Sequence, residues 1–456
     1  MTLTALLVLL VGLISGVPAR SATRARAPLA AHFPGQPDIA ASRPPVRLRV
    51  WALTEASTIA VVIILLRIDP VAALIASIIG AAVLLVITTS LVRYADACRR
   101  ARVAVQAYAP RIAVPYAGKV GVHIGMWSPW IDQTGIPWCI VARTPALFHE
   151  LAALYDVPIV QGAIPPSVRG ALYPHGATAN SAFIDGSTAT HVFLGHGDSD
   201  KPLSASERVL QYDLVAVAGQ AAIDRFATAG LVIAPERIRI IGRPQTEGIQ
   251  TEGIQTEGTE PPARVLYAPT WRHADDALNV SSLAVADQIV QALLDRGCTV
   301  VFRRHFAGQN HIEAEAMIVR VDAMLEADAA STGRAHRWGA ETMAEPLIDA
   351  FNSVDAMVSD VSGIVVDFMA SDKPLVMYAA QFVDPDDFRA SHPTARAAYV
   401  IDRDLTQMGE ALDAALGGDP LAQTRRERAD HYLGGADRFD PARRFMQLVR
   451  ELAGTT

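Results

Sequence analysis

The sequence predicts an α/β protein with two Rossmann-like domains behind an N-terminal transmembrane helical anchor. Three observations support this fold. Apolar stretches crowd the first hundred residues. From about residue 110 onward, short apolar runs alternate with helix-length amphipathic stretches, which is typical of parallel sheets covered on both faces. A repetitive polar segment divides these runs into two series, and 456 residues are enough for two or three domains.

Residues 1–105 form the predicted membrane region, with helices at about 3–17, 51–66 and 71–92. The third stretch has no charged residue and is long enough to cross a hydrocarbon core of roughly 30 Å. Nothing basic precedes the first stretch, whereas a signal peptide begins with positive charge. Whether the first stretch spans a membrane stays open.

Arginines indicate the orientation of these helices. Between the first two stretches lie Arg20, Arg24, Arg26, Arg43, Arg47 and Arg49, and after the third lie Arg93, Arg99, Arg100 and Arg102. The turn between the second and third stretches holds only Arg67. Basic segments stay on the cytoplasmic side, so everything after Arg93 is expected in the cytoplasm. A single hairpin anchor behind a polar tail would place the large domain on the same side.

The first Rossmann-like domain is predicted at 110–245 and the second at 263–456. Candidate strands of the first domain are Gly118–Ile124, Trp138–Ala142, Pro158–Gly162, His191–Leu194, Leu214–Ala218 and Ile238–Ile241. Those of the second are Arg264–Ala268, Thr299–Arg303, Ala356–Ser359, Leu375–Tyr378 and Ala398–Ile401. The clearest helices are Ser281–Arg296 and Ile312–Ala330, and two more at 422–433 and 441–452 close the chain.

A linker is predicted at 246–262, between the two series of strands. It repeats the pentad TEGIQ and ends in Pro261-Pro262. Such a segment buries too little apolar surface to offset its chain entropy. We favour the interpretation that this repeat arose by a recent expansion of the pentad and has no function of its own.

Composition excludes some classes of protein. The net charge of −7 argues against a nucleic-acid-binding protein, which needs a basic stripe. The three cysteines are far apart and odd in number, which favours a reducing compartment over a disulfide framework. Histidines and acids do not cluster at metal-ligand spacing, so neither a metal nor a cofactor is predicted.

Open parallel sheets bind ligands at the carboxyl ends of their strands, and the polar groups there are the candidate site residues. The first is His196, between two glycines after the strand at 191–194. An exposed imidazole there is suited to accept a proton from an attacking hydroxyl. A loop histidine that caps or packs is an equally good interpretation.

Two further strand ends carry cations. The strand at 264–268 is followed by Thr270 and Arg272, a phosphate-binding pair or a simple cover for the domain edge. The strand at 299–303 leads into Arg303, Arg304 and His305, which form a local anion site or a solvated strand end.

The fourth strand end, at 356–359, combines Ser359, Asp360, Ser362 and Gly363. Free N–H groups at the start of the following helix form an anion seat, although the same residues make an ordinary helix cap. Asp367 lies further along and is suited either to ribose hydroxyls or to an internal network.

In this order, these segments resemble the CDP-glycerol glycerophosphotransferase family, the teichoic acid polyol-phosphate transferases and polymerases. The matching pieces are Gly195-His196-Gly197 with Lys201-Pro202-Leu203, Ile241-Gly242-Arg243-Pro244, VLYAPTWR at 265–272, Arg303-x-His305, and SDVSGIVVDF at 359–368 with KPLVMY at 373–378. The series covers roughly residues 185–380.

The resemblance implies a glycosyltransferase-B architecture with an acceptor domain at 110–245 and a nucleotide-donor domain at 263–456. It implies transfer of glycerol phosphate from CDP-glycerol, a co-substrate, to a hydroxyl of a lipid-linked cell-envelope polymer, with release of CMP. The implied catalytic residues are His196 and His305. The implied donor-binding residues are Thr270, Arg272, Arg303, Ser359, Asp360, Ser362, Gly363 and Asp367.

The chain also departs from the family pattern. Gly195 replaces the usual Trp, and Asp198-Ser199-Asp200 changes the loop after His196. Phe306 replaces a Pro, and Gly363 replaces a second serine. Two alternatives therefore stay open: an enzyme that uses another nucleotide-sugar, and a non-catalytic polymer-assembly scaffold with a degenerate nucleotide site.

Overall fold

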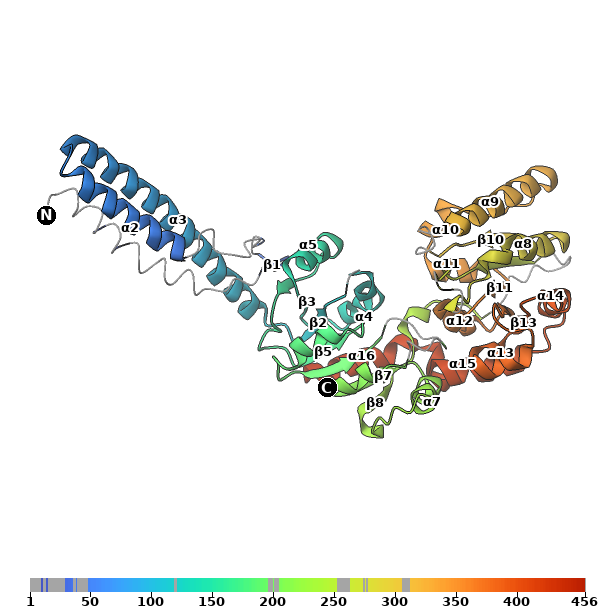
Figure 1. Ribbon diagram of the computed structural model, residues 1–456. Coiled ribbons are helices and arrows are strands. Elements are labelled where there is room, and N and C mark those ends of the chain that lie inside the picture. Colours follow the sequence, from blue (N-terminus) through green and yellow to red (C-terminus); the bar gives the residue numbers. More distant parts are fainter. Residues whose placement is uncertain are drawn as a thin grey trace. The chain divides into compact units, whose positions relative to one another are not determined.

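The computed structural model describes Leu10, Ile14 and residues 29–35, 38, 48–118, 121–195, 200, 205–251, 263–273, 275, 278–305 and 312–455 (Figure 1). The chain divides into two compact units. Unit 1 comprises Met1–Gly125, Gly135–His191 and Leu452–Thr456, and unit 2 comprises Met126–Thr134 and Val192–Glu451. Both are built from parallel strands and helices, so the fold is α/β as predicted.

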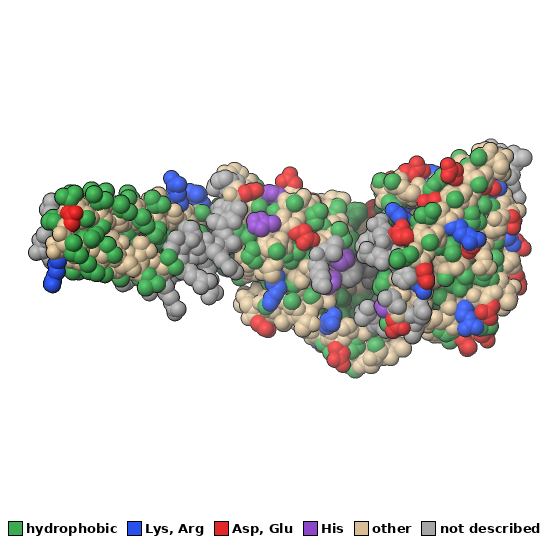
Figure 2. Space-filling model, turned by 45° about the horizontal axis from the view of Figure 1, so that its top comes forward, with side chains coloured by type: hydrophobic (Ala, Val, Ile, Leu, Met, Phe, Trp, Pro, Cys, Tyr) green, Lys and Arg blue, Asp and Glu red, His purple; other side chains and the backbone are tan. Residues whose placement is uncertain are grey.

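Unit 1 begins with a helical hairpin, α2 (Leu48–Leu65) and α3 (Pro70–Tyr108), which lie side by side (Figure 1). Asp69 starts α3 by accepting a hydrogen bond of 2.8 Å from the N–H of Val71, and Pro70 fits the first turn. Gly80 permits close packing, because a Cβ there would overlap the methyl group of Thr58. Hydrophobic side chains cover the outside of this hairpin (Figure 2).

These helices cover the predicted stretches 51–66 and 71–92, and α3 continues beyond the second. Its apolar part is long enough to cross a membrane by length and composition. The predicted helix at 3–17 lies outside the described residues, apart from Leu10 and Ile14.

The strands of unit 1 lie in the order β1-β4-β3-β2-β5. Their bounds are β1 Ala30–Ala31, β2 Ile112–Tyr116, β3 Trp138–Ala142, β4 Ile159–Gln161 and β5 Gly170–Tyr173. All neighbouring pairs are parallel except β1 with β4, in which Ala30 pairs with Val160 and Ala31 with Ile159. The short helices are η1 Gly121–Met126, α5 Pro145–Leu154, η2 Thr178–Asn180 and α6 Ser181–Ile184.

The predicted strand at 118–124 is wrong. Residues Gly121–Met126 form the 3-10 helix η1, and the strand lies earlier, at Ile112–Tyr116. Glycines at 118, 121 and 125 weaken the later segment as a strand, whereas every residue of β2 is buried. The short strands β1 and β5 were not predicted, because alanine and glycine give little β signal.

Unit 2 contains a small set of parallel strands and a separate five-stranded sheet. The small set is β6 (Thr190–Phe193), β7 (Leu214–Val217) and β8 (Ile238–Ile240). Of β6, only the last two residues belong to unit 2. Helix α7 (Gln220–Thr228) packs on β7 through Ala222 and Phe226. The further helices of this part are α4 Ser128–Gln133, η4 Glu207–Gln211, η5 Pro235–Arg237 and η6 Pro244–Thr246.

The five-stranded sheet has the order β10-β9-β11-β12-β13, and all its pairs are parallel. Its strands are β9 Arg264–Ala268, β10 Thr299–Phe302, β11 Ala356–Ser359, β12 Leu375–Tyr378 and β13 Tyr399–Ile401. The second series of strands is therefore confirmed within one residue at each end.

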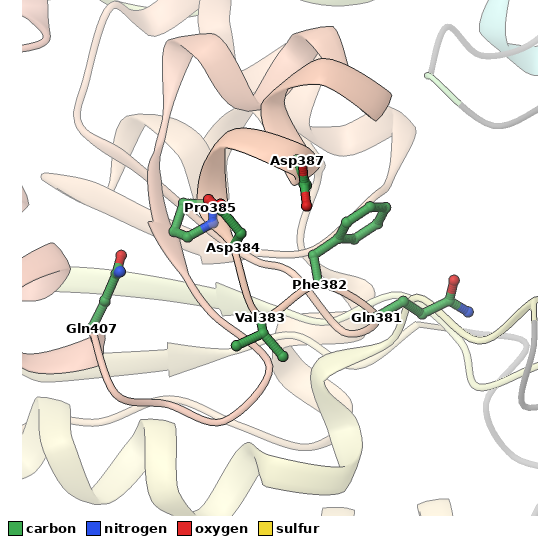
Figure 3. Close-up of a pocket in the computed structure, with 7 residues that line it drawn as sticks. All are labelled: Gln381, Phe382, Val383, Asp384, Pro385, Asp387 and Gln407. Carbon is green, nitrogen blue, oxygen red and sulfur yellow. The ribbon is translucent and has the colours of Figure 1, made fainter.

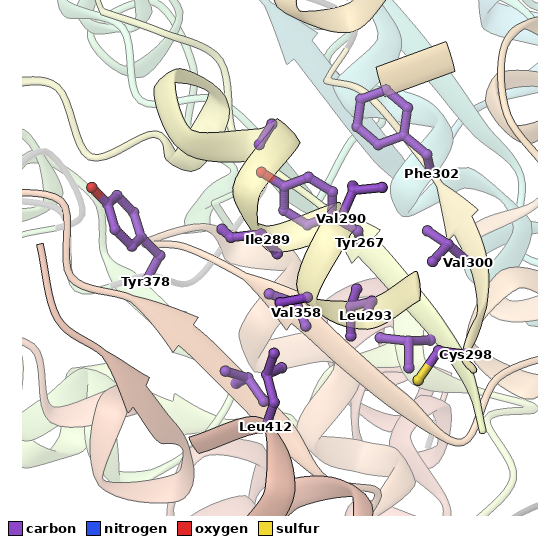
Figure 4. Close-up of a cluster of buried hydrophobic side chains, with 14 of the residues drawn as sticks. Tyr267, Ile289, Val290, Leu293, Cys298, Val300, Phe302, Val358, Tyr378 and Leu412 are labelled. Atoms are coloured by element: carbon purple, nitrogen blue, oxygen red, sulfur yellow. The ribbon is translucent and has the colours of Figure 1, made fainter. Parts of the chain in front are cut away.

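Helices cover both faces of this sheet. Successive side chains of a strand point to opposite faces, so each strand contributes to two hydrophobic cores, one on each face. Val265 and Tyr267 of β9 join the core under α8 (Ala286–Asp295), α9 (Ile312–Thr332) and α14 (Met408–Leu416) (Figure 4). Leu266 and Ala268 join the opposite core, under α12 (Gly363–Phe368) and α15 (Ala422–Leu433). The remaining helices are η8 Ser282–Val285, α10 Ala340–Ala344, α11 Leu347–Asn352, η10 Met369–Ser371, α13 Pro385–Ser391, η11 Pro393–Ala397, η12 Gly435–Phe439 and α16 Pro441–Ala453.

The beginning of the predicted linker is attached to unit 2. The side chain of Asn352 accepts a 2.8 Å hydrogen bond from the N–H of Gln250 and donates one of 2.9 Å to the carbonyl of Gly248. Residues 252–262 lie outside the described residues, and the predicted domain boundaries remain predictions.

Candidate functional site

The loops after β9, β10 and β11 meet at the carboxyl edge of the five-stranded sheet. They line one pocket with a volume of about 300 Å³. Its lining residues are Met126, Arg243, Pro269, Arg303, Arg304, His305, Met343, Leu347, Ser362, Gly363, Ile364 and Asp367. Three of the four strand ends chosen from the sequence therefore converge within unit 2.

Cations at the end of β10 give this pocket its charge. Arg303 donates to the carbonyl oxygens of Thr342 and Glu345, the latter at 2.8 Å. Burial lowers the pKa of Arg303, although a guanidinium keeps its charge at neutral pH. Arg304 lies 3.7 Å from the Glu315 carboxylate, a loose ion pair. Arg303, Arg304 and His305 therefore lie together in the lining of one pocket.

A buried ion pair forms another wall of the pocket. Arg243, just after β8, donates through Nε and Nη2 to the two carboxylate oxygens of Asp367 in α12, with Nη2 at 3.0 Å from Oδ2. Their side chains are only 7% and 10% exposed. This bidentate geometry fixes the guanidinium plane. Asp367 therefore orients Arg243. This contact agrees with one of the two interpretations from the sequence, in which Asp367 takes part in an internal network.

Ser362 and Gly363 line the pocket at the start of α12. Ser362 has an extended backbone, and its side chain makes no capping hydrogen bond with the helix. Because α12 has only six residues, its dipole is small, and the cationic side chains of the pocket lie on other segments, at Arg243, Arg303 and Arg304.

Three other predicted donor-binding residues lie behind the pocket instead of lining it. Ser359 is fully buried and donates to the carbonyl of Ala268 at 2.7 Å. Asp360 is also fully buried and accepts from the N–H of Thr270 at 2.9 Å and from Ser282, N–H at 2.8 Å and hydroxyl at 3.0 Å. Ser359 and Asp360 therefore fix the backbone of the β9 loop, to which Thr270 belongs.

Arg272 points to another partner. Its guanidinium pairs with Glu313 in the first turn of α9, and it does not line the pocket. His196 lies outside the described residues, so its place relative to the pocket stays a prediction. The residue before it is anchored, because the indole N–H of Trp127 donates to the carbonyl of Gly195 at 3.0 Å.

Asp200, at the other end of the altered loop, is part of an internal network. It accepts from the N–H and the hydroxyl of Thr394 at 2.7 and 2.5 Å and from the hydroxyl of Tyr432 at 3.3 Å. Arg225 lies 3.8 Å away. The carboxylate is thus engaged by protein groups and is not presented to a ligand.

A second, shallower pocket of about 490 Å³ lies at the same edge, beyond β12 and β13 (Figure 3). It is lined by Gln381, Phe382, Val383, Asp384, Pro385, Asp387 and Gln407. Asp384 is the cap of α13 and accepts from the N–H of Asp386 at 2.8 Å. In the described part of the chain, no three His, Cys, Asp or Glu side chains are grouped to hold a metal ion.

The structure shows which signals the sequence analysis missed. Arg243 was read only as part of a family motif, although it follows a predicted strand and so meets the same strand-end rule as Arg303. Met126, Met343 and Leu347 add apolar walls from segments that carry no polar motif. Open parallel sheets bind ligands at their carboxyl edge, and forked guanidinium groups suit phosphate oxygens, so this pocket is the candidate functional site.

Residues 193–391 match the family model described as CDP-Glycerol:Poly(glycerophosphate) glycerophosphotransferase. This range contains every predicted site residue from His196 to Asp367. The match confirms the resemblance carried by the motifs, and with it the prediction of a CDP-glycerol glycerophosphotransferase-like transferase. No curated protein matches the chain significantly.

Several solved structures resemble the fold weakly. The Wall Teichoic Acid Polymerase TagF shares 12% identity at a TM-score of 0.46, covering 76% of this chain and 89% of that one. A putative UDP-N-acetylglucosamine 2-epimerase from Listeria monocytogenes shares 11% identity at a TM-score of 0.49, covering 76% and 98%. HepE from Anabaena, in complex with UDP, shares 14% identity at a TM-score of 0.44, covering 76% and 100%.

Proposed function

We propose that this chain is a membrane-anchored transferase that moves glycerol phosphate, or a similar polyol phosphate, from CDP-glycerol to a hydroxyl of a lipid-linked cell-envelope polymer. CMP is the second product, and no cofactor takes part beyond the co-substrate. The observation that supports this most is the convergence of Arg303, Arg304, His305 and Ser362 on one pocket within the segment that matches the family.

In this proposal the pocket binds the diphosphate of the donor. A diphosphate carries several negative charges over two neighbouring groups, and forked guanidinium groups suit such oxygens. Arg303 is held by two carbonyl oxygens, and Arg243 is held by Asp367. Both are oriented before the ligand arrives, so little orientational entropy is lost on binding.

The proposed reaction is a displacement at the phosphorus that bears the glycerol. The acceptor hydroxyl oxygen bonds to this phosphorus, while the bond from phosphorus to the bridging oxygen breaks and CMP leaves with the electron pair. The hydroxyl proton passes to a base, for which we propose His196. The cations at the end of β10 and His305 offset the charge that develops on the leaving phosphate.

We also propose that the chain is anchored in the cell membrane with both units on the cytoplasmic side. α3 has the length and apolar composition of a membrane span, and it follows α2 in a helical hairpin. Strand β1, which precedes the hairpin, pairs with β4 in the sheet that follows it. Both ends of the hairpin must therefore lie on one side, and the arginine-rich flanks favour the cytoplasm.

The test is CMP release by the purified full-length protein from CDP-glycerol, CDP-ribitol and a panel of UDP-sugars, combined with calorimetric binding of each donor. Release of CMP from CDP-glycerol with a lipid-linked acceptor is the expected result. Turnover of a UDP-sugar alone would favour the nucleotide-sugar alternative. Tight binding of CDP-glycerol without turnover would favour the scaffold.

A further inference from the structure

A cluster of two histidines and a tyrosine lies at the carboxyl edge of the sheet of unit 1. Tyr116 is the last residue of β2, and His123 lies in the 3-10 helix η1 that follows it. His175 follows β5, the strand that pairs with β2. Neither histidine belongs to a motif that the sequence analysis singled out, and neither lines the pocket of unit 2.

The three side chains contact one another. The hydroxyl of Tyr116 is 2.8 Å from Nδ1 of His123. The rings of His123 and His175 stack, with centroids 5.4 Å apart and planes inclined by 19°. The ring of Tyr116 lies 6.1 Å from that of His175. Both imidazoles are half-buried, so they are ordered by packing and still reach the surface.

The backbone around the cluster is fixed from both sides. The hydroxyl of Tyr155 accepts from the N–H of Gly125 at 3.0 Å and donates to the carbonyl of Gly121 at 2.7 Å, which clamps η1. The side chain of Asn180 donates to the carbonyl of His175 at 2.8 Å. Such support from neighbouring groups is typical of side chains that must hold one orientation for a ligand.

The hydrogen bond between Tyr116 and His123 bears on which imidazole nitrogen carries the proton. Burial, with the charges of Tyr155 and Glu150, raises the pKa of Tyr116 to about 12, so the phenol stays protonated at neutral pH. When this hydroxyl donates to Nδ1 of His123, the proton of the neutral ring is on Nε2, which then donates. Arg143, exposed after the neighbouring strand β3, adds a cation that donates to Ala179 at 3.1 Å.

We propose that this edge binds a phosphate group of the acceptor through His123 and His175, with the acceptor hydroxyl presented beyond it. The proposal rests on the proposed function, because a poly(glycerophosphate) acceptor carries one phosphodiester per unit. A phosphodiester has a single negative charge, which suits imidazole donors beside one guanidinium.

The kinetic test uses His123→Gln and His175→Gln in the full-length protein, with His149→Gln as the matched control. His149 is an exposed histidine of α5 in the same unit and packs edge-on against Phe148. We expect the KM for the lipid-linked acceptor to rise about tenfold in each variant, which corresponds to about 1.4 kcal/mol. The calorimetric Kd for CDP-glycerol should stay within about twofold of the wild type, as should all constants of His149→Gln. An unchanged acceptor KM in both variants would overturn the proposal.

Direct binding separates this inference from the proposed reaction. Protein labelled with ¹³C-histidine is titrated with glycerol 3-phosphate, inorganic phosphate and glycerol, and the glutamine variants assign the resonances. We expect the two phosphates to shift the resonances of His123 and His175 and glycerol to leave them in place. Shifts in a protein that releases no CMP would support the phosphate site while contradicting the transferase. Absence of shifts with both phosphates would reject the site.

Discussion

The carboxyl edges of the two sheets differ in the kind of polar group they present. The edge in unit 2 carries permanent cations, of which Arg243 is oriented by a buried carboxylate and Arg303 by carbonyl oxygens. The edge in unit 1 carries imidazoles and a phenol, oriented by a hydrogen bond and by stacking. A donor diphosphate needs strong fixed charge, whereas an acceptor with a single charge and a reacting hydroxyl needs hydrogen-bond donors. In the proposed function, the cationic edge therefore suits the donor and the imidazole edge suits the acceptor.

The largest effect is expected where the cationic edge depends on a buried pair. Asp367→Ala leaves the Arg243 guanidinium buried without its carboxylate, and we expect a loss of about 3–5 kcal/mol in the free energy of unfolding. Denaturant titration measures it. The double variant Arg243→Met with Asp367→Met should recover most of the stability but not the affinity for CDP-glycerol. A loss below about 1 kcal/mol in Asp367→Ala would show that the pair is not desolvated.

The next effect is on turnover. His305→Ala removes a group from the wall of the pocket that we propose binds the donor, and we expect kcat/KM for CMP release to fall by about 10²–10³-fold while the stability changes little. His431→Ala is the control, a half-exposed histidine of α15 that pairs with Asp224 at 2.9 Å. Wild-type turnover by His305→Ala would remove this histidine from the mechanism.

A smaller effect is expected at Trp127. Replacement by Phe keeps a ring against Phe445 but deletes the indole N–H that holds the carbonyl of Gly195. We expect a loss of about 1 kcal/mol in stability, the typical net contribution of one hydrogen bond. Trp130→Phe, on the adjacent helix α4, is the matched control and should be neutral. Equal losses in both variants would assign the effect to ring size.

The smallest effect concerns the pH dependence of stability and depends on His392, which follows helix α13. Burial lowers the pKa of His392, so between that value and about 6.5 the unfolded chain binds more protons than the folded one. The free energy of unfolding should therefore decrease as the pH falls below about 6.5. His392→Gln should show a shallower decrease in denaturant titrations at successive pH values. An identical slope would mean that other groups cause it.

The features of this structure that could be predicted from the sequence are those whose pattern lies within one short segment of the chain. Strands β9, β11 and β12 match their predicted ranges because each is a short apolar run between polar segments. The meeting of loops at 269, 303–305 and 362–363 follows from the rule that parallel strands end at one edge. That part of the site could be predicted from strand ends alone.

Contacts between distant residues could not be predicted in this way. Arg243 and Asp367 are 124 positions apart, and nothing in either local pattern indicates the other. The same holds for Asp360, which looked like a ligand-binding acid and instead holds Thr270 and Ser282. The cluster of His123 and His175 depends on the adjacency of β2 and β5, two strands that the sequence analysis missed.

Strand β1 has a practical consequence for producing a water-soluble form of this protein. Deleting everything before β2 would remove the hairpin but would also strip Ala30 and Ala31 from β4, leaving the backbone of Ile159–Gln161 unpaired at an open edge. Such an edge is a template for aggregation. A better design keeps residues 29–47 and replaces only the mostly apolar segment 48–92 with a glycine-serine connection, so that the edge strand stays in place.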